Sequence, residues 1–307
     1  MNSPNALNYE IRPCKFAERR LLLSSLYQIV ISLKKEYQYI GFGGVAFTDF
    51  KLFHKELNID TMYSIEGGSI PLKRLEFNKP YSCIDILYGL STQELLSLDL
   101  TKPSIVWLDY DGVLSMSVFE DIKILFDALP HGSVYIVSCN RQLRDEEDNT
   151  LTNSGLEERF KGLVPYDIEE NCCADSKAPS TIKKMLSSYC HKVIEERNRL
   201  YKTNLKFVPL YNIKYQENRG ARMYTFGGVI LENDYDEQSL YRFPDAEEPL
   251  DIVIPNFTRK EALYIDQILN DNEKEQEVVA EGIATENDIY NYKKFYKYMP
   301  NFYDVRL

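Results

Sequence analysis

Two short segments carry residues that suit close binding of a ligand. The first is Gly41-Phe42-Gly43-Gly44, which follows the apolar run Tyr-Gln-Tyr-Ile. Glycine lets backbone amides come close to a ligand, and a helix that begins after such a loop points its N-terminus at the same place. The second is Glu66, about 22 residues further on, whose carboxylate can accept hydrogen bonds from two vicinal hydroxyl groups. Together the two segments predict one ligand site.

Two further acids, Asp109 and Asp111, follow Ile-Val-Trp-Leu, the most hydrophobic of the predicted strands. A carboxylate at the end of a strand can orient a reacting group or take its proton, so both acids are candidate catalytic residues. The alternative is a turn at the end of the strand whose two acids only face solvent. His54 can also act as a general base, although a lone histidine on a predicted helix is more often a packed one.

The elements that would position these residues alternate between strands and helices. The first four strands, which we expect to be parallel neighbours, are predicted at 37–41, 61–66, 83–88 and 104–109. Continuously apolar runs are typical of strands that are buried on both faces. Two β-rich runs within 206–232 flank Gly220 and predict an antiparallel hairpin at one edge. The predicted fold class is α/β, a Rossmann-like, doubly wound, mostly parallel sheet with a C-terminal antiparallel hairpin.

The predicted domain organisation is one large domain with an extension that is helical or irregular. The Rossmann-like domain spans 1–240, with an N-terminal helical segment at 1–33 and a polar insertion at 141–178. The extension spans 241–307 and is rich in tyrosine. In the extension, Thr258 and Glu261 have the spacing of a capping box and predict the start of a helix.

The charge and the cysteines limit the partners and the compartment. A net charge of −11 disfavours binding to nucleic acid. We therefore interpret Tyr290, Tyr292, Tyr296 and Tyr298 as packing residues or a surface for a protein partner. The six cysteines lack the spacing of a zinc site and are expected to be free thiols. Without a signal-like or membrane-spanning apolar run, we expect a cytoplasmic protein with no membrane contact.

Two runs of like charge, Arg19-Arg20 and Glu146-Glu147, have no partner that the sequence reveals. Charged side chains are mostly exposed in folded proteins. We therefore interpret both runs as charge that faces solvent.

The order of these elements resembles that of class I S-adenosylmethionine-dependent methyltransferases over about residues 34–233. The whole chain is also similar to a group of bacterial proteins described as O-methyltransferases, with the segments Tyr-Ile-Gly-Phe-Gly-Gly and Ser-Ile-Glu. The resemblance implies that the loop 41–44 binds S-adenosylmethionine, that Glu66 binds its ribose, and that Asp109 faces cofactor and substrate. Two positions depart from the family, because Tyr39 and Gly89-Leu90-Ser91 stand where acids are usual.

This resemblance implies methyl transfer to an oxygen or nitrogen acceptor. The two missing acids leave an alternative, a catalytically inactive protein of the same fold that acts as a binding partner or scaffold. Some O-methyltransferases also hold Mg²⁺ with an acid after the fourth strand and an Asp-Asn pair after the fifth. The corresponding residues are Asp109 or Asp111, Cys139 and Asn140. A hard cation prefers oxygen ligands, so Cys139 argues against the metal.

A second resemblance gives a different alternative. The segment Asp109-Tyr110-Asp111-Gly112-Val113 resembles the nucleophile motif of haloacid-dehalogenase-like phosphatases, where the first Asp attacks phosphorus and Mg²⁺ lies between the two acids. The remaining roles would fall to Ser138, Lys214 and Asp234 or Asp236. That motif normally follows the first strand, whereas three predicted strands precede it here.

Overall fold

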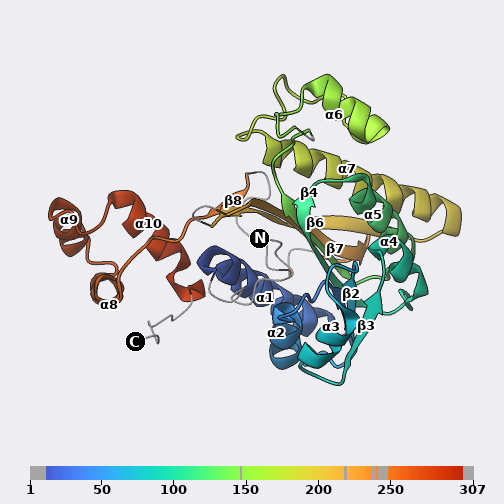
Figure 1. Ribbon diagram of the computed structural model, residues 1–307, viewed down its shortest axis with the longest axis horizontal. Coiled ribbons are helices and arrows are strands. Elements are labelled where there is room, and N and C mark those ends of the chain that lie inside the picture. Colours follow the sequence, from blue (N-terminus) through green and yellow to red (C-terminus); the bar gives the residue numbers. More distant parts are fainter. Residues whose placement is uncertain (1–11, 146, 218–219, 237–239, 241–247, 300–307) are drawn as a thin grey trace.

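Within the described residues, eight strands form one sheet with helices on both of its faces (Figure 1). The computed structural model describes residues 12–299 except 146, 218–219, 237–239 and 241–247. The strand order is β3-β2-β1-β4-β5-β7-β6-β8. The strands are β1 (Gln38–Gly41), β2 (Met62–Glu66), β3 (Ile84–Tyr88), β4 (Ser104–Val113), β5 (Val134–Asn140), β6 (Leu205–Gln216), β7 (Arg222–Glu232) and β8 (Leu250–Ile252).

Helices connect the parallel strands and cover the sheet. They are α1 (Pro13–Leu33), α2 (Thr48–Leu57), α3 (Leu72–Asn78), α4 (Ser91–Glu94), α5 (Met116–Ala128), α6 (Asn153–Phe160), α7 (Ala178–Tyr201), α8 (Arg259–Ile268), α9 (Asn272–Ala280) and α10 (Glu286–Phe295). The first five strands pair only in parallel with one another, whereas β7 runs antiparallel to both β5 and β6. The predicted α/β fold class, with its C-terminal antiparallel hairpin, is confirmed.

The expected position of the hairpin at the edge of the sheet is wrong. The short strand β8 pairs in parallel with β6, with Ile213 opposite Leu250, and forms the outer strand instead. A strand of three residues is too short to show an alternating pattern in the sequence. Its pairing depends on a contact between segments that are far apart along the chain.

Strand β4 shows why the central strands are apolar at every position. Ile105 and Trp107 belong to the buried cluster that includes residues of α1 and α2. Val106 and Leu108 belong to a second cluster, on the side of α5 and α7. Because successive side chains of a strand point to opposite faces, a strand between two helical layers must be apolar on both.

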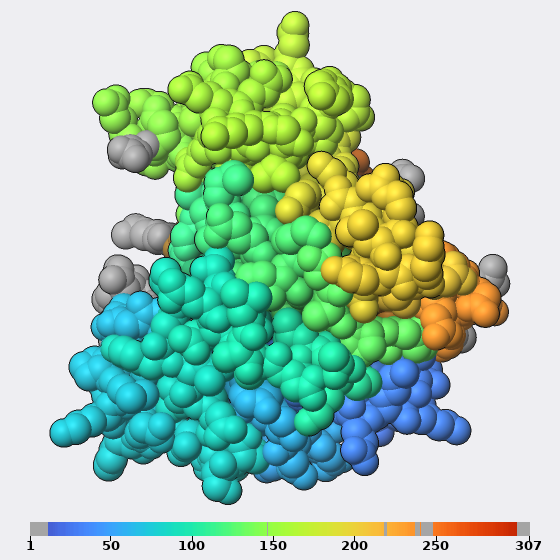
Figure 2. Space-filling view, turned by 90° about the vertical axis from the view of Figure 1, so that its right-hand side faces the viewer, coloured from blue at the N-terminus to red at the C-terminus, as the bar shows by residue number. Residues whose placement is uncertain are grey.

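The polar segment 141–178 contains α6 and packs on the α5–α7 side. Leu156 and Phe160 of α6 are buried in the same cluster as the apolar residues of those two helices. Figure 2 faces this side and shows the yellow-green residues around α6 at one end of the molecule. The cyan residues around α3 and β3 lie at the opposite end.

Helices α8, α9 and α10 lie to one side of the sheet (Figure 1) and have a small core of their own. Ile265 and Tyr292 belong to this core, whereas Phe295 is buried with residues of α1 and α2. The predicted capping box is confirmed, since Thr258 and Glu261 exchange side-chain to backbone hydrogen bonds at the start of α8. The division into domains near residue 240 stays a prediction.

Two structural features bear on the expected compartment. All six cysteines are free, as predicted. In the part of the chain that the structure describes, no helix is both long enough and apolar enough to cross a membrane. The cytoplasmic location itself stays a prediction.

Candidate functional site

A cavity of about 370 Å³ opens beyond the carboxyl ends of β1, β2, β3 and β4. In an open α/β sheet, ligands bind beyond the carboxyl ends of the strands, at the point where the strand order reverses. The structure brings six of the candidate residues together there: Phe42, Gly43, Gly44, Glu66, Asp109 and Asp111. Gly41 does not line the cavity. A Cβ atom at Gly41 would lie 2.9 Å from the carbonyl oxygen of Trp107, so this glycine serves the close packing of β1 and β4.

The loop after β1 favours glycine at two positions, one because of space and one because of backbone conformation. A Cβ atom at Gly43 would lie 2.5 Å from Ser64 Oγ and 2.7 Å from the ring of Phe47. Gly44 has a φ of 55°, in the left-handed region that favours glycine. The backbone of this loop is therefore packed directly against β2 at the wall of the cavity.

Glu66 ties this loop to β2. Its Oε1 atom accepts hydrogen bonds from the amides of Gly43 and Gly44, each at 3.0 Å, and from Ser64 Oγ at 2.6 Å. Burial raises the pKa of the Glu66 carboxyl above its ordinary value, while these hydrogen bonds favour the carboxylate and oppose the rise. Among the described residues, no hydrogen bond reaches Oε2. That oxygen can therefore accept a hydrogen bond from a ligand in the cavity.

Charged residues of α1 make two ion pairs at the site. Lys15 Nζ lies 2.5 Å from Asp109 Oδ2, and Arg19 makes a buried ion pair with Asp49 at the start of α2. Arg19 and Asp49 both line the cavity. Lys15 and Arg19 are four residues apart and so share one face of the helix. The two ion pairs thus attach α1 to both β4 and α2.

The prediction that Arg19 faces solvent is wrong. This residue is only 4% exposed, because its face of α1 packs against the sheet, where the guanidinium lies 5.6 Å from the centre of the Trp107 ring. The neighbouring Arg20 and the distant Glu147 are exposed, as predicted, and Glu146 lies outside the described residues. Of the two adjacent arginines, Arg19 is therefore buried and Arg20 is exposed.

Glu18 lies on the same side of α1 and ends a chain of hydrogen bonds across three strands. Trp107 Nε1 donates to Ser138 Oγ at 2.9 Å, Ser138 shares a hydrogen bond with Thr225 Oγ1 at 2.7 Å, and Thr225 donates to Glu18. Burial raises the pKa of Glu18 to about 7, and the negative charge of Asp109 adds to the rise. Thr225 and Glu18 are 207 residues apart, so no local pattern could reveal their contact.

Strand β4 does not end at Asp109, as the sequence suggested, but continues to Val113. Its pairing with β5 is interrupted between Asp109 and Val113 by a bulge or irregularity. Asp109, Tyr110 and Asp111 all line the cavity, and Tyr110 also donates a hydrogen bond to Asp121 of α5. Asp111 is exposed, whereas the Asp109 side chain is only 9% exposed. The two candidate acids therefore differ strongly in their environment.

The residues that a phosphatase would need are not gathered at the cavity. Asp109 lies in the fourth strand along the chain, not the first. Ser138 is fully buried, and Lys214 pairs with an aspartate of β8 at 3.3 Å. Asp234 and Asp236 follow β7, which runs antiparallel to β5. They therefore lie toward the amino ends of the parallel strands, whereas the cavity lies at the carboxyl ends. This arrangement does not support the phosphatase alternative.

The proposed magnesium ligands do not fit a hard cation. Cys139 is buried among apolar side chains, and burial raises its thiol pKa to about 12, so the thiol stays protonated. The side-chain oxygen of Asn140 accepts a backbone hydrogen bond at 3.1 Å. Asp109 is ion-paired, which leaves Asp111 as an exposed acid beside these groups. These residues do not offer the set of oxygen ligands that Mg²⁺ requires.

His54 and the C-terminal tyrosines do not line the cavity. His54 lies in the last turn of α2, whereas the first turn of that helix borders the site. Its position therefore does not support a role as a general base there. Tyr292 is buried and donates to Asp266 Oδ1 at 2.8 Å, while Tyr290 and Tyr296 are exposed. A protein partner at these tyrosines stays a prediction.

Comparison with known proteins gives one family match and several similar structures. The family model described as "Putative O-methyltransferase" matches residues 7–307. The N-methyltransferase NodS from Bradyrhizobium japonicum, solved with S-adenosyl-L-homocysteine, is similar with a TM-score of 0.42 and 11% identity, covering 73% of this chain and 90% of that one. A putative caffeoyl-CoA O-methyltransferase from Staphylococcus aureus has a TM-score of 0.35 and 12% identity, covering 68% and 83%. The comparison with curated proteins finds no match.

Proposed function

The chain belongs to the putative O-methyltransferase family, and we propose that it transfers a methyl group from S-adenosylmethionine to an oxygen or nitrogen acceptor. The observation that carries this proposal is that the glycine loop, Glu66 and Asp109 border the same cavity. S-adenosylmethionine supplies an electrophilic methyl group when bound. The protein must then hold it, exclude water and align the acceptor.

The glycine loop and Glu66 form the cofactor end of the proposed site. Gly43 and Gly44 allow the backbone to come close to the cofactor, and α2 begins just beyond the loop with its N-terminus toward the cavity. Glu66 Oε2 accepts hydrogen bonds from the ribose hydroxyls, since Oε1 already holds the loop. Phe42 and Leu90 add apolar surface that helps to exclude water.

Asp109 and Asp111 form the acceptor end. Asp109 accepts a hydrogen bond from the acceptor group, which orients a lone pair toward the methyl carbon, and takes the proton as the new bond forms. Lys15 holds the Asp109 carboxylate in place through their ion pair. Asp111 is exposed beside the cavity and contacts the outer part of the acceptor.

Calorimetric titration of the purified protein with S-adenosylmethionine and S-adenosylhomocysteine tests the proposal. We expect one molecule of either ligand to bind per chain, with weaker binding in the Glu66→Ala variant. Glu157→Ala is a matched control, because Glu157 is exposed on α6, far along the chain from the site. Absence of binding to the wild type at millimolar ligand would refute the proposal. Binding without turnover of any oxygen or nitrogen acceptor would favour the scaffold alternative.

A further inference from the structure

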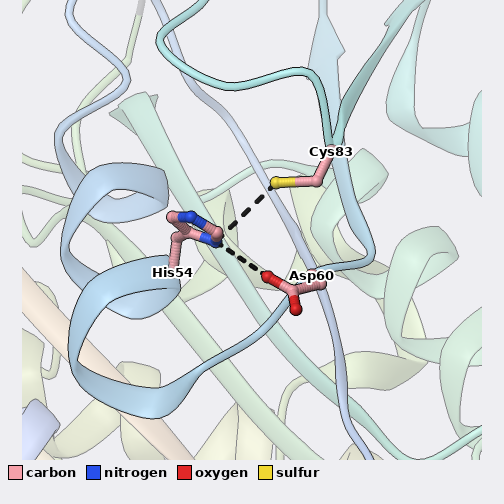
Figure 3. Close-up of side chains that lie close together, drawn as sticks. All are labelled: His54, Asp60 and Cys83. Atoms are coloured by element: carbon pink, nitrogen blue, oxygen red, sulfur yellow. Dashed lines mark hydrogen bonds and ion pairs between the residues drawn. The ribbon is translucent and has the colours of Figure 1, made fainter.

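Three side chains with metal-binding atoms meet at the other end of the sheet from the cavity. His54 lies in the last turn of α2, Asp60 lies in the loop before β2, and Cys83 directly precedes β3 (Figure 3). Their ligand atoms all lie within 4.8 Å of one another. Glu66 ends β2 at the cavity, so the length of that strand, about 15 Å, separates the two places. We propose that His54, Asp60 and Cys83 form a binding site for Zn²⁺.

The backbone holds these three residues in place before any metal binds. The buried Phe53 and Ile59 anchor α2 and the loop on either side of His54 and Asp60. The amide of Met62 at the start of β2 donates to the carbonyl oxygen of Cys83 at 3.1 Å. The site therefore requires little ordering of the chain, which lowers the entropic cost of binding.

The two distances from His54 to its partners are close to those of a tetrahedral zinc site. His54 Nδ1 lies 3.1 Å from Asp60 Oδ1 and 3.7 Å from Cys83 Sγ. Bonds of about 2.0–2.2 Å from zinc to nitrogen and oxygen, and about 2.3 Å to sulfur, place ligand atoms about 3.3–3.6 Å apart. Small rotations of the side chains would bring all three atoms onto one ion. The His54 side chain is 28% exposed and that of Asp60 is 79% exposed, which gives the ion a path and leaves a fourth position for water.

The same ring nitrogen of His54 faces both partners, and this distinguishes a metal site from a catalytic triad. A triad needs one imidazole nitrogen for the acid and the other for the thiol, so that a proton can pass through the ring. Here Nδ1 lies close to both Asp60 and Cys83, as Figure 3 shows. The three ligand atoms therefore point at one place instead of forming a relay.

Zinc binding would replace interactions that the side chains now make. Nδ1 lies 3.0 Å from the carbonyl oxygen of Ile59, so the ion must displace that contact, and the imidazole proton must then reside on Nε2. The ring of Tyr81 lies 4.2 Å from the imidazole, centre to centre, and limits its rotation. The Cys83 thiol releases its proton to solvent as the zinc–sulfur bond forms. Nitrogen, oxygen and sulfur ligands together suit Zn²⁺ and not Mg²⁺.

Titration of the full-length, tag-free protein with Co²⁺, followed by Zn²⁺, tests the site. We expect one equivalent of Co²⁺ to give a thiolate-to-cobalt charge-transfer band and the visible bands of a tetrahedral ion, and one equivalent of Zn²⁺ to remove both. Excess Mg²⁺ should leave the spectrum unchanged. Cys83→Ser should abolish the charge-transfer band, and His54→Gln and Asp60→Asn should each weaken binding by at least roughly tenfold.

Matched variants control for other thiols and imidazoles. Cys173→Ser and His191→Gln, both remote from Cys83 in the sequence, should keep the full spectrum. Asp60 is exposed, so the Asp60→Asn variant should fold normally. It therefore still tests the site if a variant at a more buried position, such as Cys83→Ser, fails to fold. A wild type without the charge-transfer band, or a Cys83→Ser variant that retains it, would overturn the zinc site. Glu66→Ala should bind Co²⁺ normally, so this result is independent of the proposed methyltransferase activity.

Discussion

The two walls of the cavity are built in different ways. The glycine wall consists of Gly43, Gly44 and Glu66, where two backbone amides and the hydroxyl of the neighbouring Ser64 donate to one carboxylate oxygen. The helix wall consists of Arg19, Asp49 and Asp109. Arg19 pairs with Asp49, and Asp109 pairs with Lys15, which does not itself line the cavity. Members of the first wall lie at most 23 residues apart, whereas Lys15 and Asp109 are 94 apart. The contacts of the glycine wall thus form between segments close in sequence, whereas those of the helix wall require the complete fold.

This difference suggests a division of work between the walls. Backbone amides and a single carboxylate suit a cofactor that stays the same in every reaction. Buried ion pairs carry a large desolvation cost, and the loss of one partner leaves the other charge buried and unpaired. Substitutions in the helix wall should therefore affect turnover and stability, and those in the glycine wall should affect cofactor affinity.

The largest effect is expected from Asp109→Asn. The amide keeps the size of the side chain but cannot take a proton, so we expect kcat to fall by about 10²–10⁴-fold while S-adenosylmethionine still binds. Methyl-transfer rates and calorimetry on the same preparation provide the measurement. Asp111→Asn is the control and should have a smaller effect. An equal loss of cofactor affinity in Asp109→Asn would contradict the division between the walls.

The next effect is on stability. Arg19→Met leaves the Asp49 carboxylate buried without its cationic partner, which should lower the free energy of unfolding by about 3–5 kcal/mol. Denaturation in urea, monitored by circular dichroism, measures the loss. The double variant Arg19→Met/Asp49→Leu removes both charges and should recover much of the stability. If the double variant is no more stable than Arg19→Met, the ion pair is not the cause.

A smaller effect is expected at the glycine wall. Glu66→Ala removes charge-assisted hydrogen bonds worth about 1.5–3 kcal/mol, so S-adenosylmethionine should bind about ten- to a hundredfold more weakly. Calorimetry measures this change, and Glu66→Gln should have an intermediate affinity. Ser64→Ala removes a donor to the same oxygen and should weaken binding less. Unchanged affinity in Glu66→Ala would remove this residue from the cofactor site.

The smallest expected effect is the pH dependence of stability that the buried Glu18 causes. Because the pKa of Glu18 in the folded protein is raised to about 7, the native state binds more protons than the unfolded chain from about pH 4.5 up to about 7. Stability from this group is therefore complete at lower pH and decreases as the pH rises through that window. The expected loss is about 1 kcal/mol between pH 6 and about pH 7.5. Urea denaturation at several pH values should show this slope in the wild type and a flatter one in Glu18→Gln.

Sequence reasoning succeeded where the signal is local. A side chain would not fit at Gly43, and Gly44 has a left-handed backbone conformation that favours glycine. Continuous apolar runs such as that in β4 mark strands covered on both faces. It failed where the partner is remote. Arg19 looks like a surface charge until the fold brings α2 beside α1, and the chain of hydrogen bonds from Trp107 to Glu18 depends on three strands meeting. Patterns over ten or twenty residues contain no information on such contacts.

The short outer strand β8 has a consequence for how molecules of this protein meet one another. A sheet edge with a long row of unpaired backbone groups can template the addition of a strand from a second chain. Strand β8 offers only the three residues Leu250–Ile252, and its exposed Asp251 is paired with Lys214 of the neighbouring β6. Joining two such strands would form few backbone hydrogen bonds and would crowd two ion pairs together. We therefore expect concentrated solutions to resist association through β8, because so short a strand gives a second chain few backbone groups to pair with.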